Sequence, residues 1–252
     1  MLRYAAPSDW VLGKYRLDVS ADGRPWQSVA WEVVPPLVPA TLASAEDIMP
    51  LRVGTTWPMA FTSRSSPQVT VTLPGAERDA NGVYHMSAAI TIPGVENDGV
   101  RVRHARNGKL AEEELWQVGA GGIAVTGRLA SPKPLRVDPP LPIIPFPLPA
   151  SETSWDWRSG QEGQWKFRGW GPVPLAGPNG EQPGYVIVME QPTMARTMAR
   201  ERDIIPGLGI SREVFVHQTG QGVTLLHQEY VLTGAPTMSD PDGSAAPGSE
   251  KP

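Results

Sequence analysis

The sequence contains no cysteine, which removes disulfide bonds, thiol catalysis, thiolate metal sites and lipid attachment through a cysteine side chain. No run of apolar residues approaches the roughly 20 that a membrane-spanning helix needs. The first residues show no apolar segment of the kind found in signal peptides. Lysine and arginine form no basic run and the formal net charge is -4, which argues against nucleic acid as the main partner.

Recognisable catalytic motifs are also missing. There is no Gly-x-Ser-x-Gly elbow, and no glycine-rich loop opens a helix. Glu112 and Glu114 can converge on one strand face, but we expect a solvated surface there because no supporting motif accompanies them. His217 and His227 flank one predicted hairpin at an offset too large to share a metal ion. The sequence therefore predicts no enzyme, no cofactor and no metal site.

Proline and glycine are abundant instead, with 28 and 26 residues among 252. Proline removes a helical hydrogen bond and restricts the residue before it, so this density leaves little room for long helices. Segments such as 84–92, 114–118 and 123–127 alternate apolar and polar residues with the period of a half-buried strand. Composition and alternation together predict an all-β, antiparallel protein.

The sequence also resembles itself at an offset of about 100 residues, a fixed spacing that indicates a repeated unit. Pro50-Leu51 before Trp57 returns as Pro147-Leu148 before Trp155. We therefore predict two curved antiparallel sheets, either half-barrels or one pseudo-twofold barrel, preceded by a hairpin. The predicted boundaries are a hairpin at 1–35, a linker at 36–46, a first repeat at 47–135, a second repeat at 136–234 and a disordered tail at 235–252.

A proline-rich segment follows the first repeat. Six of the twelve residues from Asp138 to Pro149 are proline. Proline cannot donate a hydrogen bond to a neighbouring strand, which excludes a central strand here. Apolar residues between the prolines argue against a solvated linker. We expect a polyproline-type strap along the surface of one or both repeats.

The first residues resemble the last two strands of bacterial immunoglobulin-like modules. The similarity rests on Trp10, Gly13, Tyr15-Arg16 and Asp18, a turn at Asp22-Gly23 and a strand that ends at Trp31-Glu32-Val33. It implies an immunoglobulin-like hairpin or partial module.

A second resemblance covers the larger part of the chain. The segment from Asp138 through Pro147-Leu148 to Trp155, and the turn at 205–210, are similar to uncharacterised bacterial envelope lipoproteins. The resemblance implies a curved sheet like the half-barrels of lipoprotein carriers, and an extracytoplasmic location in the periplasm or at the cell surface. This sequence departs from the family because it lacks the lipid-bearing cysteine and has Ser151 where a glycine is expected.

Tryptophans are concentrated in one predicted hairpin, around a turn at 160–163. Such residues can fill a core, stack on sugars or line an apolar pocket. Trp57 and Trp155 occupy repeated positions, so we expect both in the core. The candidates for ligand or partner binding, against the alternative of core or inter-domain packing, are Trp157, Trp165 and Trp170.

Apolar residues on the alternating strands supply a second candidate set. Met86 and Ile90 in the first repeat, with Ile187 and Met189 in the second, lie at positions from which a curved sheet can contact an apolar ligand. These four residues are candidates for binding an apolar ligand.

A basic segment supplies the third set. Arg196 and Arg200, with Arg202 and Arg212 nearby, give the second repeat a basic edge. Charge at a sheet edge blocks uncontrolled strand pairing. The alternative is contact with an anionic partner such as a lipid headgroup or an envelope polymer.

These observations favour a non-catalytic structural or interaction component of a bacterial cell-envelope assembly, with a protein partner. The alternatives are a carrier that binds a lipid or other apolar ligand in the curved sheets, and a carbohydrate-binding module that uses exposed tryptophans. A dry apolar cavity would favour the carrier, and a filled core with exposed aromatics would favour the interaction protein.

Overall fold

The protein is described here by a computed structural model that covers residues 13–21, 24–33, 42–96, 99–129, 134–160, 163–192 and 196–239. These residues form β-strands and one short 3-10 helix, η1 (Ala45–Asp47). The strands are β1 (Gly13–Ala21), β2 (Arg24–Val33), β3 (Thr55–Ser65), β4 (Glu77–Arg78), β5 (Tyr84–Glu96), β6 (Gly99–Arg106), β7 (Lys109–Gly119), β8 (Gly122–Arg128), β9 (Leu135–Pro145), β10 (Thr153–Ser159), β11 (Gly163–Gly177), β12 (Gly180–Pro192), β13 (Arg196–Ile205), β14 (Gly209–Thr219), β15 (Thr224–Leu232) and β16 (Thr237–Met238). The predicted all-β class is confirmed.

The first two strands form a separate antiparallel hairpin in which Gly13 pairs with Val33 and Leu17 with Val29. The pairing agrees with the strands expected from the alternation around the Asp22-Gly23 turn, whose two residues lie outside the described part. Its relation to immunoglobulin-like modules stays a prediction.

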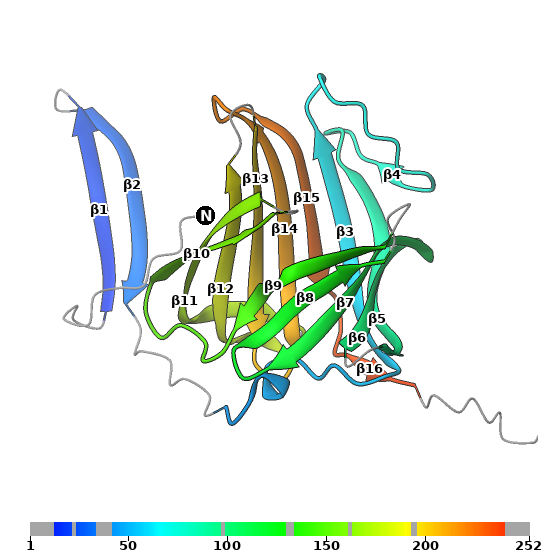
Figure 1. The fold of residues 1–252 in the computed structure, drawn as a ribbon. Helices are drawn as coiled ribbons and strands as arrows, with labels where there is room; N and C mark the ends of the chain where they lie inside the picture. The colour runs from blue at the N-terminus through cyan, green and yellow to red at the C-terminus, as the bar shows by residue number, and fades with distance from the viewer. Residues whose placement is uncertain are drawn as a thin grey trace, which may run out of the picture.

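The remaining strands form one antiparallel sheet. Its main order is β10-β11-β12-β13-β14-β15-β3-β5-β6-β7-β8-β9, and the short strands β16 and β4 pair with β3 and β5. Strand β15, near the end of the described chain, pairs with β3, near its start, through contacts such as Tyr230 with Phe61. The sheet curves until its two ends, β9 and β10, approach each other (Figure 1). There the Trp157 indole Nε1 donates a hydrogen bond of 3.0 Å to the Pro140 carbonyl oxygen. The result is a nearly closed barrel.

The proline-rich segment is a strand and not a strap. Residues Leu135–Pro145 form β9, which pairs with β8 through Val125 with Leu141 and Ile123 with Ile144. The ladder is irregular, with register shifts between Ile123 and Ala124 and between Val125 and Gly127. Because β9 lies at an end of the sheet, its prolines need not donate to a second neighbour, which is the position where strands tolerate proline.

One hydrophobic cluster lies inside the barrel and draws on both predicted repeats. Strand β3 places alternate residues inside, including Trp57, Met59 and Phe61, as its alternating burial pattern shows. The second repeat contributes Ile187 and Leu232 among others to the same cluster. The Trp57 Nε1 atom donates to the Leu208 carbonyl oxygen at 2.6 Å, which ties β3 to the turn before β14. The two predicted repeats therefore share one sheet and one core, while the duplication itself stays a prediction.

The segment expected as a tail begins with ordered pairing. Thr237 and Met238 of β16 pair with Thr56 and Thr55 of β3. The expected tail from 240 onward lies outside the described residues, as does most of the expected linker. Within the described ranges, no helix is long and apolar enough to cross a membrane.

Candidate ligand-binding site in the barrel interior

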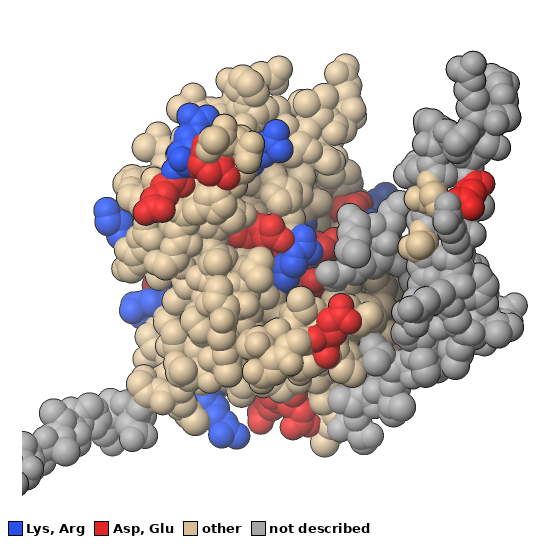
Figure 2. All heavy atoms as spheres, turned by 180° about the vertical axis from the view of Figure 1, so that it is seen from behind, with Lys and Arg blue, Asp and Glu red and all other residues tan. Residues whose placement is uncertain are grey.

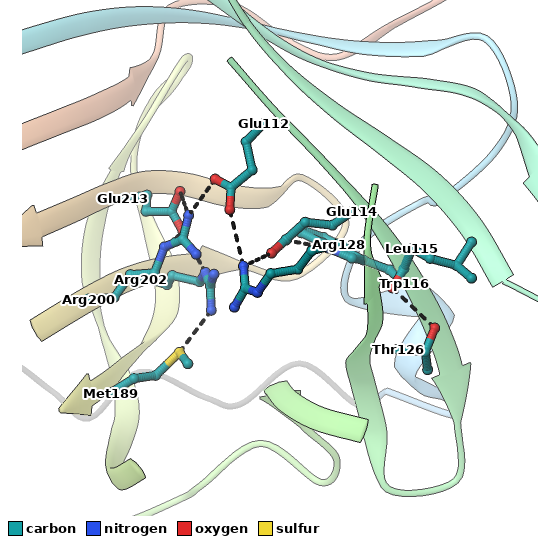
Figure 3. Close-up of polar contacts among 10 residues, drawn as sticks. All are labelled: Glu112, Glu114, Leu115, Trp116, Thr126, Arg128, Met189, Arg200, Arg202 and Glu213. Carbon is teal, nitrogen blue, oxygen red and sulfur yellow. Dashed lines mark hydrogen bonds and ion pairs between the residues drawn. The ribbon is translucent and has the colours of Figure 1, made fainter. Parts of the chain in front are cut away.

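A cluster of charged side chains lies inside the barrel. On the outer face that Figure 2 shows, acidic and basic side chains of the described residues are interspersed and not gathered by sign. Inside, arginines and glutamates from two opposite walls point toward one another (Figure 3). Residues two apart on a strand face the same side, so the spacing of Arg200 and Arg202 on β13, and of Glu112 and Glu114 on β7, sends both members of each pair inward.

Arg202 and Glu213 form the most deeply buried ion pair of the interior. Both side chains are 1% exposed, and Arg202 Nε lies 2.6 Å from Glu213 Oε1. Arg200 Nε approaches the same oxygen to 2.9 Å, and Arg202 Nη1 contacts Met189 Sδ at 3.1 Å. Burial alone would raise the pKa of Glu213, but the charges of Arg200 and Arg202 outweigh burial and hold this pKa below its usual value. Glu213 is therefore an ionised, fully engaged carboxylate.

A second group on the opposite wall centres on Arg128 of β8. Its Nη1 lies 3.2 Å from Glu112 Oε1 and 2.5 Å from Glu114 Oε1. The indole Nε1 of Trp116 donates to Glu114 Oε2 at 2.8 Å. Arg200 Nη2 reaches Glu112 Oε2 at 3.3 Å, which links β13 to β7 across the interior although several strands separate them in the sheet.

The two carboxyls of this group have opposite pKa shifts. Burial raises the pKa of Glu112, but Arg200, His104 and Arg128 outweigh it and bring this pKa to about 2. The pKa of Glu114 is raised, first by burial and then by the negative charge of Glu112. The side chain of Glu112 keeps 36% of its surface exposed, and this surface borders the cavity described below.

Arg106, at the end of β6, is held by aromatic residues. Its Nε donates to the Tyr230 hydroxyl oxygen at 2.6 Å. Its guanidinium carbon lies 4.3 Å from the centroid of the Phe61 ring and 5.4 Å from that of Tyr230. A guanidinium over an aromatic face is an attractive and orienting contact.

Most of these charged residues line a cavity of about 330 Å³. The polar part of its lining comprises Arg106, Glu112, Glu114, Arg128, Arg200 and Glu213 with Gln191, Gln228 and Tyr230. The apolar part comprises Val125, Leu141, Ile143, Trp165, Met189, Met198 and Phe215. Small-molecule sites combine an apolar lining with convergent polar groups, and this cavity has both, with an unusually large polar share.

Three of the residues predicted from the sequence line this cavity, namely Trp165, Met189 and Arg200. Ile90 and Ile187 are buried in the surrounding core, and Met86 is partly buried against it. These six residues belong to β5, β11, β12 and β13. Residues predicted in two separate repeats therefore lie around one core.

The other three predicted residues lie elsewhere. Trp157 packs partly buried on the core at the seam between β10 and β9. Trp170 packs against a second, smaller cluster formed by Val173, Leu175, Val186, Val188 and Ile205. Arg196 is exposed at the start of β13. The structure does not bring these three residues to the cavity.

The basic edge predicted from Arg196, Arg200, Arg202 and Arg212 is wrong in its geometry. Strand β13 lies between β12 and β14 and is not an edge. Arg200 and Arg202 point into the barrel, while Arg212 pairs with Glu201 at 2.7 Å. The expected solvated surface for the carboxylate run is also wrong, because Glu114 is buried.

Sequence reasoning missed Arg106, Arg128 and Glu213 as site residues. The sequence did contain a signal for an interior charge cluster. Glu-x-Glu at 112–114 and Arg-x-Arg at 200–202 each place two like charges on one face of a strand, and the two pairs are opposite in charge. Both strands also carry buried residues. The large offset predicted between His217 and His227 along their hairpin is also wrong. His217 pairs with Leu226 and His227 with Val216, so the two imidazoles lie on neighbouring rungs and opposite faces. Among the described residues, no group of three or more His, Asp or Glu side chains could hold a metal ion.

Comparison with known proteins finds likeness at the level of solved structures. No protein-family model matches the sequence, and no curated protein matches it. A presumed exported protein with a YmcC-like fold from Bacteroides fragilis NCTC 9343 is similar at 9% identity and a TM-score of 0.36, covering 75% of this chain and 98% of that one. A presumed lipoprotein from Parabacteroides distasonis ATCC 8503 is similar at 11% identity and a TM-score of 0.33, with the same coverage. At these values neither structure bears on the ligand or partner of this chain.

Proposed function

We propose that this protein is a non-catalytic binding protein that holds a small amphipathic molecule inside its barrel. The observation that carries the proposal is the interior cavity of about 330 Å³, in which apolar side chains and a cluster of arginines and glutamates border the same space. Such a space can bury the apolar body of a ligand while a few polar groups orient its head. This proposal follows the carrier alternative and places a polar anchor where the sequence suggested a purely apolar surface.

The size of the cavity limits the ligand. Small-molecule sites span roughly 300 to 1,000 Å³, and a cavity of about 330 Å³ is at the lower end of that range. It suits one acyl chain or a ligand of similar size better than a diacyl lipid.

Two other functions receive less support. A carbohydrate-binding surface needs accessible aromatic rings, but Trp165 is 7% exposed and Trp170 packs against neighbouring side chains. General base catalysis needs an accessible carboxyl whose pKa lies near the working pH. The pKa of Glu112 is about 2, and Glu114, whose pKa is raised, is fully buried. An envelope location and a protein partner in an assembly remain part of the proposal through the sequence resemblance, and they are compatible with a carrier.

Native mass spectrometry of the purified full chain tests the proposal. We expect extra mass of small-molecule size that is lost on denaturation, or binding of a neutral apolar fluorescent probe such as N-phenylnaphthylamine after delipidation. Met198→Trp should fill part of the cavity, because Met198 lines it, and should weaken probe binding. Val95→Trp is the matched control, since Val95 is 67% exposed. Absence of both adduct and probe binding would contradict the proposal.

A further inference from the structure

The charges of the barrel interior do not balance. Three arginines, Arg128, Arg200 and Arg202, interlock with three glutamates, Glu112, Glu114 and Glu213, through contacts of 2.5 to 3.3 Å. Arg106 is a fourth arginine on the same cavity. Among the described residues, this cluster therefore has four arginines and three glutamates, which leaves one positive charge in excess.

Arg106 is the residue that carries this excess. None of the described carboxylates forms an ion pair with Arg106, whose hydrogen bond goes from Nε to the neutral Tyr230 hydroxyl. Its position is nevertheless defined, because the guanidinium lies over the Phe61 and Tyr230 rings. The remaining nitrogens, Nη1 and Nη2, donate to none of the described residues and form the flat two-pronged donor that suits a carboxylate.

Trp165 is a second donor at this cavity that lacks an acceptor. It lines the same cavity, and its buried indole Nε1 finds no acceptor within the described structure. A donor without an acceptor in a buried place is costly. Two donor groups around one cavity, one of them charged, therefore lack acceptors that a ligand can supply.

We infer that the occupant of the barrel is an anionic amphiphile whose carboxylate head binds Arg106 and whose hydrocarbon body packs against the apolar lining. This inference rests on the proposed function and names the chemical class of the ligand. An unpaired charge in a partly buried site is unfavourable, and a bound anion compensates the excess. A cationic ligand would instead add to it.

Matched ten-carbon probes test the inference on the purified full chain. Decanoate and decanol share their hydrocarbon body and differ in the charge of the head group. We expect the wild-type protein to bind decanoate at least 10-fold more tightly than decanol, measured by calorimetry or by displacement of N-phenylnaphthylamine. Charged hydrogen bonds of this kind correspond to effects on the order of 10- to 100-fold.

Variants then locate the anchor. Arg106→Gln should weaken decanoate binding by about 10-fold or more and change decanol binding little, while Arg106→Lys should retain part of the preference. Arg103→Gln is the matched control, because Arg103 lies on the same strand but pairs with Glu113 away from the cavity. Near-UV circular dichroism checks that each variant keeps its fold.

The outcomes separate the two proposals. Equal binding of decanoate and decanol by the wild type would overturn the inference and leave the binding function standing. A preference that survives in Arg106→Gln would overturn the role of Arg106. Binding of neither probe would count against the proposed function itself. The comparison of decanoate with decanol uses only the wild-type protein. It therefore tests the preference for an anionic ligand even if Arg106→Gln does not fold.

Discussion

At the scale of single residues, the most unusual feature is a guanidinium and a carboxylate removed almost completely from solvent. Arg202 and Glu213 are each 1% exposed and lie 2.6 Å apart. Burying two charges costs more than their attraction returns unless further contacts satisfy them. Here Arg200 and the Met189 sulfur supply such contacts. The pair therefore tolerates burial only as part of the larger network.

Removing the Glu213 carboxylate, which Arg200 and Arg202 share, tests whether the buried charges depend on this network. Glu213→Gln leaves Arg200 and Arg202 close together without their common partner. We expect a loss of about 3 to 5 kcal/mol in the free energy of unfolding, the usual cost of breaking a buried pair. Urea denaturation followed by tryptophan fluorescence measures it.

The control for this substitution is Glu201→Gln. Glu201 pairs with Arg212 at 2.7 Å near the surface, where the two side chains are 38% and 29% exposed. Exposed pairs contribute about 1 kcal/mol or less, so this variant should stay close to wild type. Similar losses in the two variants would contradict the assignment of the buried network.

The opposite pKa shifts of Glu112 and Glu114 predict two opposite effects of pH. Glu112 has a folded pKa of about 2 against an ordinary 4.5, so the unfolded chain binds its proton first as pH falls. The stability that Glu112 contributes is present above pH 4.5 and is lost between 4.5 and about 2. Glu114 has a raised folded pKa, so its contribution is present below 4.5 and is lost as pH rises through the folded value.

Urea denaturation between pH 2 and pH 8 separates the two effects. Glu112→Gln should flatten the loss of stability on the acid side, and Glu114→Gln should flatten the decline above pH 4.5, the ordinary value for this carboxyl. Parallel pH profiles for both variants and the wild type would show that neither carboxyl is shifted as the geometry requires.

At the scale of elements, the turn between β7 and β8 shows how closely strands approach one another. Gly122 has a φ of +120°. A Cβ at this position would lie 2.0 Å from the Ile144 carbonyl oxygen of β9. Because that neighbour is backbone, it cannot move aside as a flexible side chain would. The glycine thus allows the irregular β8–β9 pairing that closes one side of the cavity.

Gly122→Ala should therefore be destabilising. The unfavourable φ alone costs about 1 to 2 kcal/mol, and the contact with β9 adds to this, so we expect a loss above about 2 kcal/mol in thermal or urea denaturation. Gly119→Ala in the same turn is the control, since nothing lies within 4 Å of its Cβ position. Equal behaviour of the two variants would mean that β8 and β9 are not packed as described.

At the scale of the whole molecule, the barrel depends on contacts between distant parts of the chain. The pairing of β15 with β3 joins Tyr230 to Phe61, and one hydrophobic cluster includes Trp57, Trp116, Ile187 and Leu232. Interior ion pairs add a further link between β7 and β13. Neither half of the sheet can cover its own apolar face, so we expect the halves to fold together.

Cutting the chain between β9 and β10 tests this expectation. Fragments 1–145 and 146–252 should each lack cooperative unfolding and native near-UV circular dichroism, because each leaves half of the shared core exposed. Co-expression or mixing should restore both signals. A cooperative transition in either fragment alone would instead show an independent domain and would support the boundary predicted near residue 136.

Much of the strand pattern could be predicted because it is local. Alternation placed strands at 84–92, 114–118 and 123–127, which lie within β5, β7 and β8. The glycine turn at 119–122 was also predictable, and Gly119 pairs with Gly122 there. The aromatic hairpin forms as expected, with Trp155 opposite Phe167 and Trp157 opposite Trp165. Short-range periodicity and turn residues carry this information without reference to the rest of the chain.

The sequence by itself thus determined that the chain forms antiparallel strands, where many of them lie and which residues share a face. Only the tertiary structure decided which face is inside, because a period of two is the same for either side of a sheet. Because β13 is an inner strand with this face turned inward, Arg200 does not lie at a sheet edge as expected. It forms ion pairs with Glu112 and Glu213 in the interior. The tertiary structure also made the proline segment an end strand, since a proline strand is acceptable only where one neighbour is missing. Barrel closure is a long-range property, and the binding site exists only because closure brings the walls together.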